Sequence, residues 1–168
     1  MESPILDVRG LTVEFATRAG TARAVDGVTL RVAAGETLCI VGESGCGKSI
    51  TALSIMGLVP YPGSVKGGEI RLNGVDLRQM SAAELGNVRG DRVSMIFQDP
   101  SSSLNPVHTV GKQIAEVYRL HRDMGPGEAE AAAMKMLAAV GIPDPARRMK
   151  AYPHEMSGGM AQRVMIAM

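Results

Sequence analysis

The segment Gly42-Glu43-Ser44-Gly45-Cys46-Gly47-Lys48-Ser49 fits the pattern G-x-x-x-x-G-K-S/T. It follows the apolar run 37–41, which predicts a buried strand. It precedes residues 49–58, whose pattern predicts a helix that buries Ala52, Leu53, Ile55 and Met56 and ends at Gly57. A strand, a glycine-rich turn and a helix are the context that this pattern needs in order to hold a phosphate. The segment therefore predicts a phosphate-binding loop, and its flanks disfavour a glycine-rich turn without a ligand.

The loop would offer three kinds of group to a nucleoside triphosphate. Backbone N–H groups from Gly45 to Ile50 would converge on the β-phosphate at the positive end of a helix. The Lys48 ammonium would point toward the β- and γ-phosphates, and the Ser49 hydroxyl would ligate Mg²⁺. The candidate binding residues are Gly42, Glu43, Ser44, Gly45, Cys46, Gly47, Lys48, Ser49 and Ile50.

Composition narrows the function classes. A length of 168 residues with 45% apolar content suits one domain with a substantial core. A formal net charge of +1 and 3% aromatic residues argue against a nucleic-acid partner. Cys39 and Cys46 have no metal-ligand neighbours, so we expect two reduced thiols in a cytosolic protein and no metal held by cysteine.

Neither a leader nor a membrane span is expected. The first four residues contain no basic stretch followed by an apolar one, which a signal peptide requires. No apolar run approaches the ~20 residues that cross a bilayer. Any connection with a membrane should therefore run through a partner.

Residues 1–98 are predicted to be rich in strands. Besides the segments flanking the phosphate loop, alternating apolar residues predict strands at 5–8, 11–15, 24–25, 28–32 and 69–74, the last closed by Asn73-Gly74. Asp26-Gly27 is typical of a turn, and Ser81 with Glu84 is typical of a helix capping box. The run 92–97 predicts a further buried strand, which ends at Gln98.

Residues 99–168 are predicted to be helical after the turn-rich loop 99–106. A first helix has Val110, Ile114, Val117 and His121 on one stripe. A second begins at Pro126, ends at Gly141, and has the apolar stripe Ala129, Ala132, Ala133, Met136, Leu137 and Val140. A third begins at Ser157 and continues to Met168.

The start of the third helix contains a second distinctive motif. Met156-Ser157-Gly158-Gly159 offers a hydroxyl, bare backbone and the positive end of a helix, which together suit an anion. Taken alone, an ordinary helix cap explains it better. The motif gains weight because it lies 109 residues after Lys48, with Gln98 at a strand end between them.

Together these residues resemble the ATPase subunit of ATP-binding-cassette (ABC) transporters, from Leu6 to Met168. The loop 42–49 is similar to the Walker A motif, Gln98 to the Q-loop, and Ser157-Gly158-Gly159 to the signature motif. The resemblance implies an α/β P-loop NTPase core (1–98) with N-terminal antiparallel strands and an inserted all-helical subdomain (99–168). The segments that look like the oligopeptide/dipeptide and nickel importer branch are 52–58, 96–100, 103–106, 152–154, 157–160 and 162–167. Ala161 departs from the arginine expected there.

The resemblance also implies how a site would be completed. In this family two ATPase subunits pair head to tail, and each ATP lies between the Walker A loop of one and the signature motif of the other. Lys48 and Gln98 would be catalytic, with Ser49 and Gln98 near Mg²⁺. Ser157, Gly158 and Gly159 would contact the γ-phosphate in trans. Phe15 would stack on adenine, unless it is an ordinary core aromatic residue.

As a member of that branch, the protein would energise import of di- and oligopeptides. Its partners would be transmembrane permease subunits and, indirectly, an extracytoplasmic peptide-binding protein. It would lie peripherally on the cytoplasmic face of the inner membrane.

The family's Walker B strand, catalytic glutamate and switch histidine follow the signature helix, so the resemblance implies a truncated subunit. His108, His121 and His154 precede that point, so none of them is the switch histidine; packing is expected for His154. Residues 1–168 alone should bind ATP at best, hydrolyse it poorly, and aggregate or form molten material, since a parallel sheet without its middle strands exposes unpaired edges.

Other functions remain open at this point. A soluble cassette ATPase of DNA repair is disfavoured because the interval between the two motifs has no sustained heptads. One of the translation type carries two cassettes on one chain, which a length of 168 residues cannot reveal. A phosphate-loop kinase or GTPase is disfavoured by the helical insertion and by Ser157-Gly158-Gly159. A truncated remnant without a function is not excluded.

Overall fold

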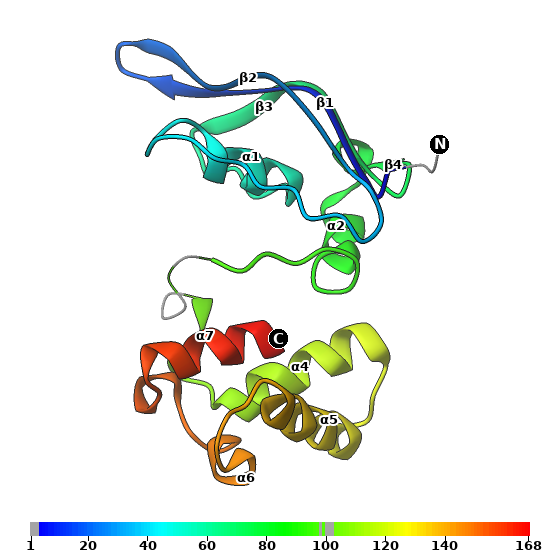
Figure 1. Cartoon of the computed structure of the whole chain (residues 1–168), viewed down its shortest axis with the longest axis vertical. Coiled ribbons are helices and arrows are strands. Elements are labelled where there is room, and N and C mark those ends of the chain that lie inside the picture. Colours follow the sequence, from blue (N-terminus) through cyan, green and yellow to red (C-terminus); the bar gives the residue numbers. More distant parts are fainter. Residues whose placement is uncertain (1–3, 98, 100–102) are drawn as a thin grey trace. The chain divides into compact units, whose positions relative to one another are not determined.

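The computed structural model describes residues 4–97, 99 and 103–168. The chain divides into two compact units, one ending at Arg89 and the other spanning Gly90–Met168 (Figure 1). The first unit contains the sheet and the helix that follows the phosphate loop, and the second unit is helical. The domain boundary predicted at Gln98 remains a prediction, because that residue lies outside the described residues.

The sheet of the first unit has four strands, all paired antiparallel, in the order β2-β1-β3-β4. They are β1 (Leu6–Thr17), β2 (Gly20–Val32), β3 (Gly63–Leu72) and β4 (Val75–Asp76). The turn predicted at Asp26-Gly27 is wrong, because these residues lie inside β2. Gly27 has a φ of 65° and the pairing with β1 shifts register there, so a bulge absorbs the extra residue and the ladder continues. The short strands predicted on either side are therefore one strand.

The Asn73-Gly74 sequence forms a tight turn at the end of β3, as predicted, and this turn leads into β4. Asn73 and Gly74 have φ values of 50° and 83°, the left-handed conformations that a two-residue hairpin turn requires. Val8, Leu11, Val13 and Ile70 are buried beneath the sheet, and α1 (Lys48–Ile55) lies along that face (Figure 1). This packing holds the start of α1, and with it the phosphate loop, against the antiparallel sheet.

Two predicted strands are absent from the described residues. Residues 37–41 and 94–97 form no ladder, and Val93 makes only an isolated bridge with Arg89. The side chains predicted to be buried are instead exposed: Val41 by 89%, Ile96 by 54% and Phe97 by 39%. Apolar runs of this kind indicate strands that are covered on both faces. A strand also needs a neighbour, and no described segment pairs with either run.

Helix α1 differs from its prediction in length and in its buried face. It ends at Ile55, and Gly57 closes it with a φ of 63°. Thr51 and Ser54 are buried, whereas Ala52, Leu53 and Ile55 are only partly buried. The two hydroxyls can be buried because they donate to the carbonyls of Gly47 and Ile50, at 3.0 and 2.6 Å.

The capping box predicted for the next helix, α2 (Ala82–Val88), is confirmed. The Ser81 hydroxyl accepts from the Glu84 N–H at 3.3 Å, and the Glu84 carboxylate accepts from the Ser81 N–H at 2.7 Å. Between β4 and α2 lies the 3₁₀ turn η1 (Leu77–Gln79).

The second unit is built from α4 (Val110–Arg122), α5 (Pro126–Ala139), α6 (Pro145–Arg148), η2 (Pro153–Glu155) and α7 (Gly158–Ala167). Its core includes Val110, Ile114, Ala133, Leu137 and Val164. The stripe predicted on the first helix is only partly right, because Val117 and His121 are half-buried. Gln113 is buried in their place, and its amide donates to the carbonyls of Asn105 and His108, both at 3.0 Å. The predicted start of α5 at Pro126 and its closure at Gly141, with a φ of 73°, are confirmed.

None of the helices in the described ranges is both long and apolar enough to cross a membrane.

An ion-pair group on the sheet gives a prediction of pH dependence. Asp7 is buried, and its carboxylate accepts from Arg9 at 2.5 Å and from Arg31 at 3.2 Å. The hydrogen bond with Arg9, and then that with Arg31, hold the pKa of Asp7 below its usual 3.8. The ion pairs therefore stabilise the fold fully above that pH, and this stabilisation is lost as pH falls through the lowered pKa. Asp7→Asn should thus weaken hydrogen-exchange protection of the β1 and β2 amides at neutral pH, with the deficit shrinking below pH 3.8.

The matched control is Asp26→Asn, because the Asp26 side chain is 71% exposed in its ion pair with Arg23. That variant should change protection little at any pH. A deficit for Asp7→Asn that stays constant through the acidic range would contradict the assignment.

Candidate nucleotide-binding site

The phosphate loop is a tight turn whose shape depends on its glycines. Gly45 and Gly47 have φ values of 84° and 94°, and the Cys46 N–H donates to the Glu43 carbonyl at 3.4 Å. A Cβ on Gly47 would lie 2.5 Å from the carbonyl oxygen of Ala24, on β2. Glycine is needed at position 47 both for its backbone conformation and for this close approach.

The loop and the first turn of α1 present N–H groups that are free to bind an anion. In the described part of the chain, the N–H groups without a hydrogen-bond partner include those of Gly45, Gly47, Lys48, Ser49 and Ile50. The Thr51 N–H begins the helical ladder, donating to Gly47 at 2.8 Å. Because these donors lie at the positive end of α1, their arrangement fits a phosphate group.

The Lys48 side chain lies over the loop. Its Nζ donates to the carbonyl oxygens of Gly42 and Glu43 at 2.8 and 2.6 Å, and it lies 3.5 Å from the Cys46 Sγ. These contacts keep a positive charge beside the free N–H groups. A second anionic group could therefore be recognised by the ammonium while the first occupies the backbone donors.

The loop also fits a magnesium ion that arrives with phosphates. Ser49 is exposed, and its hydroxyl has no partner among the described residues, so it is available as a ligand. Those residues contain no group of three or more His, Cys, Asp or Glu that could hold a metal by itself. Mg²⁺ commonly takes one or two protein ligands and fills its other positions with phosphate oxygens and water. Gln98, the other predicted ligand, lies outside the described residues.

Phe15 lies in β1 and is partly buried. Its ring covers Gly63 of β3, where an added Cβ would come within 2.6 Å of the ring atoms Cε1 and Cζ. Its stacking on adenine remains a prediction.

The second motif forms a helix N-terminus, as predicted. The Ser157 hydroxyl accepts from the Met160 N–H at 3.3 Å, which makes Ser157 the cap of α7. Gly158 and Gly159 are exposed, neither has a positive φ, and an added Cβ would meet no atom within 4 Å at either position. No described part of the structure therefore requires glycine there. The motif belongs to the second unit, whereas the phosphate loop belongs to the first.

Sequence reasoning missed a residue that fixes α1 at its far end. The Arg89 guanidinium donates to the carbonyls of Met56 and Gly57, at 2.7 and 2.9 Å, where the helix dipole is negative. These two bonds tie the C-terminal end of α1 to the start of the segment after α2. Arg89 lies more than thirty residues after the helix and belongs to no motif. The sequence predicted where the helix ends, near Gly57, but not which residue would bind its last carbonyls.

The cysteines and histidines add no catalytic centre among the described residues. Cys39 and Cys46 are both free and exposed. The ring of His154 stacks on that of Tyr152, with centroids 5.7 Å apart, which agrees with the packing role expected for it.

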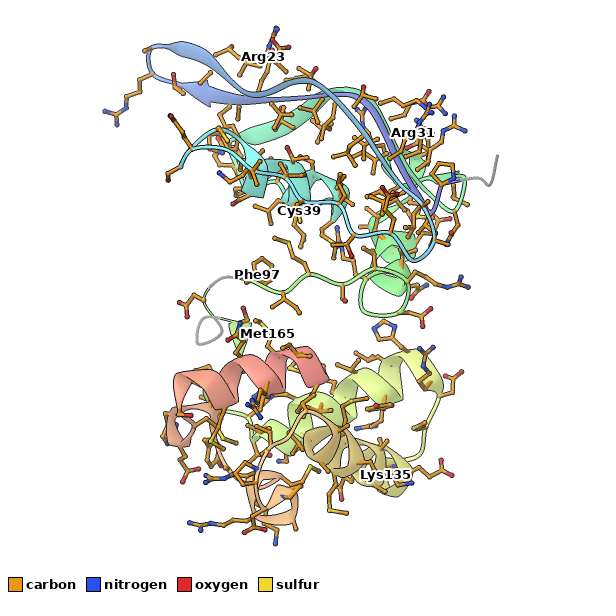
Figure 2. The ribbon with its side chains drawn as sticks, in the orientation of Figure 1. Arg23, Arg31, Cys39, Phe97, Lys135 and Met165 are labelled. Carbon is orange, nitrogen blue, oxygen red and sulfur yellow. The ribbon has the colours of Figure 1, made fainter. Side chains whose placement is uncertain are left out.

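An apolar cavity of about 300 Å³ lies within the second unit. Its walls include Ile96 and Phe97 on one segment and Met165 and Met168 at the end of α7; Phe97 and Met165 are labelled in Figure 2. These apolar walls hold no cluster of charged groups.

The profile of the ABC transporter family matches residues 25–168. The fold agrees, because 96% of the chain superposes on 67% of a chain in the dimeric structure of MJ0796, a bacterial ABC transporter cassette, with a TM-score of 0.81 and 26% identity. A second structure of that cassette, a post-hydrolysis state bound to ADP and Pi, gives a TM-score of 0.82. The chain belongs to the ABC transporter family and has its α/β cassette fold.

Similar proteins include several that are named for peptide, dipeptide or oligopeptide transport. The probable peptide ABC transporter ATP-binding protein y4tR of Sinorhizobium fredii is 52% identical over 165 residues, which is 98% of this chain and 49% of that protein. The dipeptide transport ATP-binding protein DppD of Bacillus subtilis is 50% identical over the same share of each chain. The chain thus spans about half the length of the relatives it matches.

Proposed function

We propose that these residues form the ATP-binding part of the ATPase subunit of an ABC importer for di- and oligopeptides. The observation that carries the proposal is the identity of about half along almost the entire chain with dipeptide and oligopeptide transport proteins. The free N–H groups at the start of α1 support it, because they provide the anion site that such a subunit needs. Peptide ABC importers work at a membrane, so the subunit would bind permease subunits on the cytoplasmic face.

The phosphate loop would hold ATP in cis. Its N–H groups would bind the β-phosphate, Lys48 would move from the loop carbonyls toward the γ-phosphate, and Ser49 would ligate Mg²⁺. The metal, when bound, neutralises charge on the phosphate oxygens. Gln98 would orient the attacking water and touch the metal, and Phe15 would stack on adenine.

The signature motif would act in trans, on ATP held by a second cassette. The described residues of their own unit give no reason for glycine at positions 158 and 159, which supports a role in letting a group from another molecule approach the backbone. Glycine lets a phosphate approach the backbone closely, and the start of α7 favours negative charge. The solved cassette that this chain resembles is itself dimeric. The second cassette could be another copy of this chain or a relative.

The test uses the intact subunit, which here means a subunit of the relatives' length that contains these residues. It should bind Mg-ATP and co-purify with permease subunits. Cells lacking it should fail to grow on a dipeptide that supplies a required amino acid, yet grow on the free amino acid. Unchanged growth on dipeptides, or co-purification with DNA or ribosomes in place of a permease, would reject the proposal.

A change at Gly47 should damage the loop without touching a nucleotide-binding side chain. In Gly47→Ala the new Cβ meets the Ala24 carbonyl at 2.5 Å, and the φ of 94° is strained for alanine. We expect a loss of about 1–3 kcal/mol in stability and severe loss of ATP binding, measured by thermal melting and nucleotide titration.

Gly86→Ala is its control, because Gly86 lies inside α2 with open space around it. That substitution should raise stability by up to ~1 kcal/mol and leave ATP binding unchanged. Equal behaviour of the two variants would show that the loop does not depend on its approach to β2.

A further inference from the structure

Helix α7, which begins with the signature glycines, packs on its unit through apolar side chains, the partly buried Met160 among them. Ala161, Val164 and Ala167 are its buried residues. Apolar burial has no preferred direction, and alanine presents a nearly smooth surface. These contacts hold α7 in the unit, and a directional contact would fix its rotation and axial position more narrowly.

One directional contact does define them. The Arg163 Nη1 donates to the carbonyl oxygens of Val140 and Gly141, at 3.3 and 3.0 Å. Within the described ranges, this is the one hydrogen-bonded connection between α7 and another helix or its cap. It joins residues more than twenty positions apart in the chain.

The contact is well matched chemically. Val140 and Gly141 follow the last turn of α5, where unpaired carbonyls and the helix dipole attract a cation. Arginine keeps its charge at any physiological pH. A Cβ on Gly141 would lie 2.7 Å from Nη1, so glycine at this position also leaves room for the guanidinium.

Arg163 lies six residues after Ser157, which is ~9 Å along a helix axis. A helix segment of that length moves as a rigid body. Sliding or turning at Arg163 would therefore displace the Ser157 hydroxyl and the first N–H groups of α7 by a similar amount.

We propose that Arg163 is a positioning residue, which ties α7 to the end of α5 so that Ser157-Gly158-Gly159 meets the γ-phosphate of ATP held by the second cassette. This rests on the proposed function, and Arg163 itself touches no nucleotide. Its loss should impair the signature motif while the Walker A loop still binds ATP normally.

The test compares Arg163→Ala and Arg163→Lys in the intact subunit. The control is Arg119→Ala, which removes an exposed arginine on α4 that has no partner among the described residues. Pairing of subunits in a non-hydrolysable ATP analogue is measured by sedimentation, ATP binding by unpaired subunits by titration, and folding by thermal melting. Arg163→Ala should weaken pairing about tenfold, the effect of losing charge-assisted hydrogen bonds. ATP binding and melting should change little, and lysine should partly restore pairing because it too can donate to a carbonyl.

Four outcomes would count against these proposals. Normal pairing of Arg163→Ala, or equal weakening by Arg119→Ala, would overturn the positioning role. A fall in melting temperature and ATP binding that parallels the pairing defect would also overturn it, because it would mark a merely structural residue. Failure of the unmodified subunit to pair in the analogue would instead count against the proposed function.

Discussion

Lys48→Ala in the intact subunit should abolish peptide import and lower ATP affinity at least ~100-fold, because it removes a charge-assisted contact with phosphate. The fold should tolerate the change. Where the structure describes the chain, the Lys48 ammonium bonds only to carbonyls of its own loop and to the Cys46 sulfur, so no described helix or strand loses a partner. ATP titration and import of a labelled dipeptide measure the two effects.

Lys66→Ala is the matched control, since Lys66 is an exposed lysine on β3 of the same unit. It should bind ATP and support import as the unmodified subunit does. Substantial ATP affinity in Lys48→Ala would show that the ammonium stays on the loop carbonyls and does not reach the phosphates.

Gly159→Ala should weaken the pairing of subunits while leaving the stability of its unit intact, whereas a core mutation would lower stability. An added methyl meets no described atom within 4 Å, and alanine is favoured over glycine in a helix by up to ~1 kcal/mol, so the unit should be as stable or slightly more so. The methyl would nevertheless occupy the space through which a γ-phosphate approaches the backbone. Nucleotide-driven pairing of subunits should fall at least ~10-fold, equivalent to about 1.4 kcal/mol, with ATP binding by single subunits unchanged.

The control for that substitution is Gly127→Ala. Gly127 also lies in the first turn of a helix, α5, and a Cβ there also meets nothing within 4 Å. It should gain the same stability and pair normally. If both variants paired normally, the signature glycines would have no role in closing the site.

Much of the fold could be predicted because local chemistry determined it. The Asn73-Gly74 turn, the Ser81–Glu84 capping box, the Pro126 start and the Gly141 end of α5 each depend on residues a few positions apart. The bulge at Gly27 could not be distinguished from a turn, because glycine serves both and only the partner strand decides. The strands predicted at 37–41 and 92–97 are absent from the described residues for a related reason. Apolar sequence indicates that a strand could be buried, but ladder formation requires a neighbour that no local pattern supplies.

The candidate site was predictable to the same extent. The phosphate loop and the cap at Ser157 follow from short motifs, and the structure gives both the expected helix starts. The roles of Gln98 and Phe15 came from family resemblance and remain predictions. Residues that lie against these two helices or their ends were not foreseen, among them Ala24, Arg89 and Arg163. Each acts through a contact between segments distant in sequence, involving a backbone carbonyl, which leaves no pattern in the chain.

The central claim is that one ATP is held by the phosphate loop of one cassette and the signature motif of another. Mixing two inactive subunits, Lys48→Ala and Gly159→Ala, tests it most directly. If the two motifs act in trans, each mixed pair contains one composite site in which both are intact, and ATPase activity should reappear on mixing. If mixed pairs form and remain as inactive as either variant alone, the two motifs do not share a nucleotide across subunits.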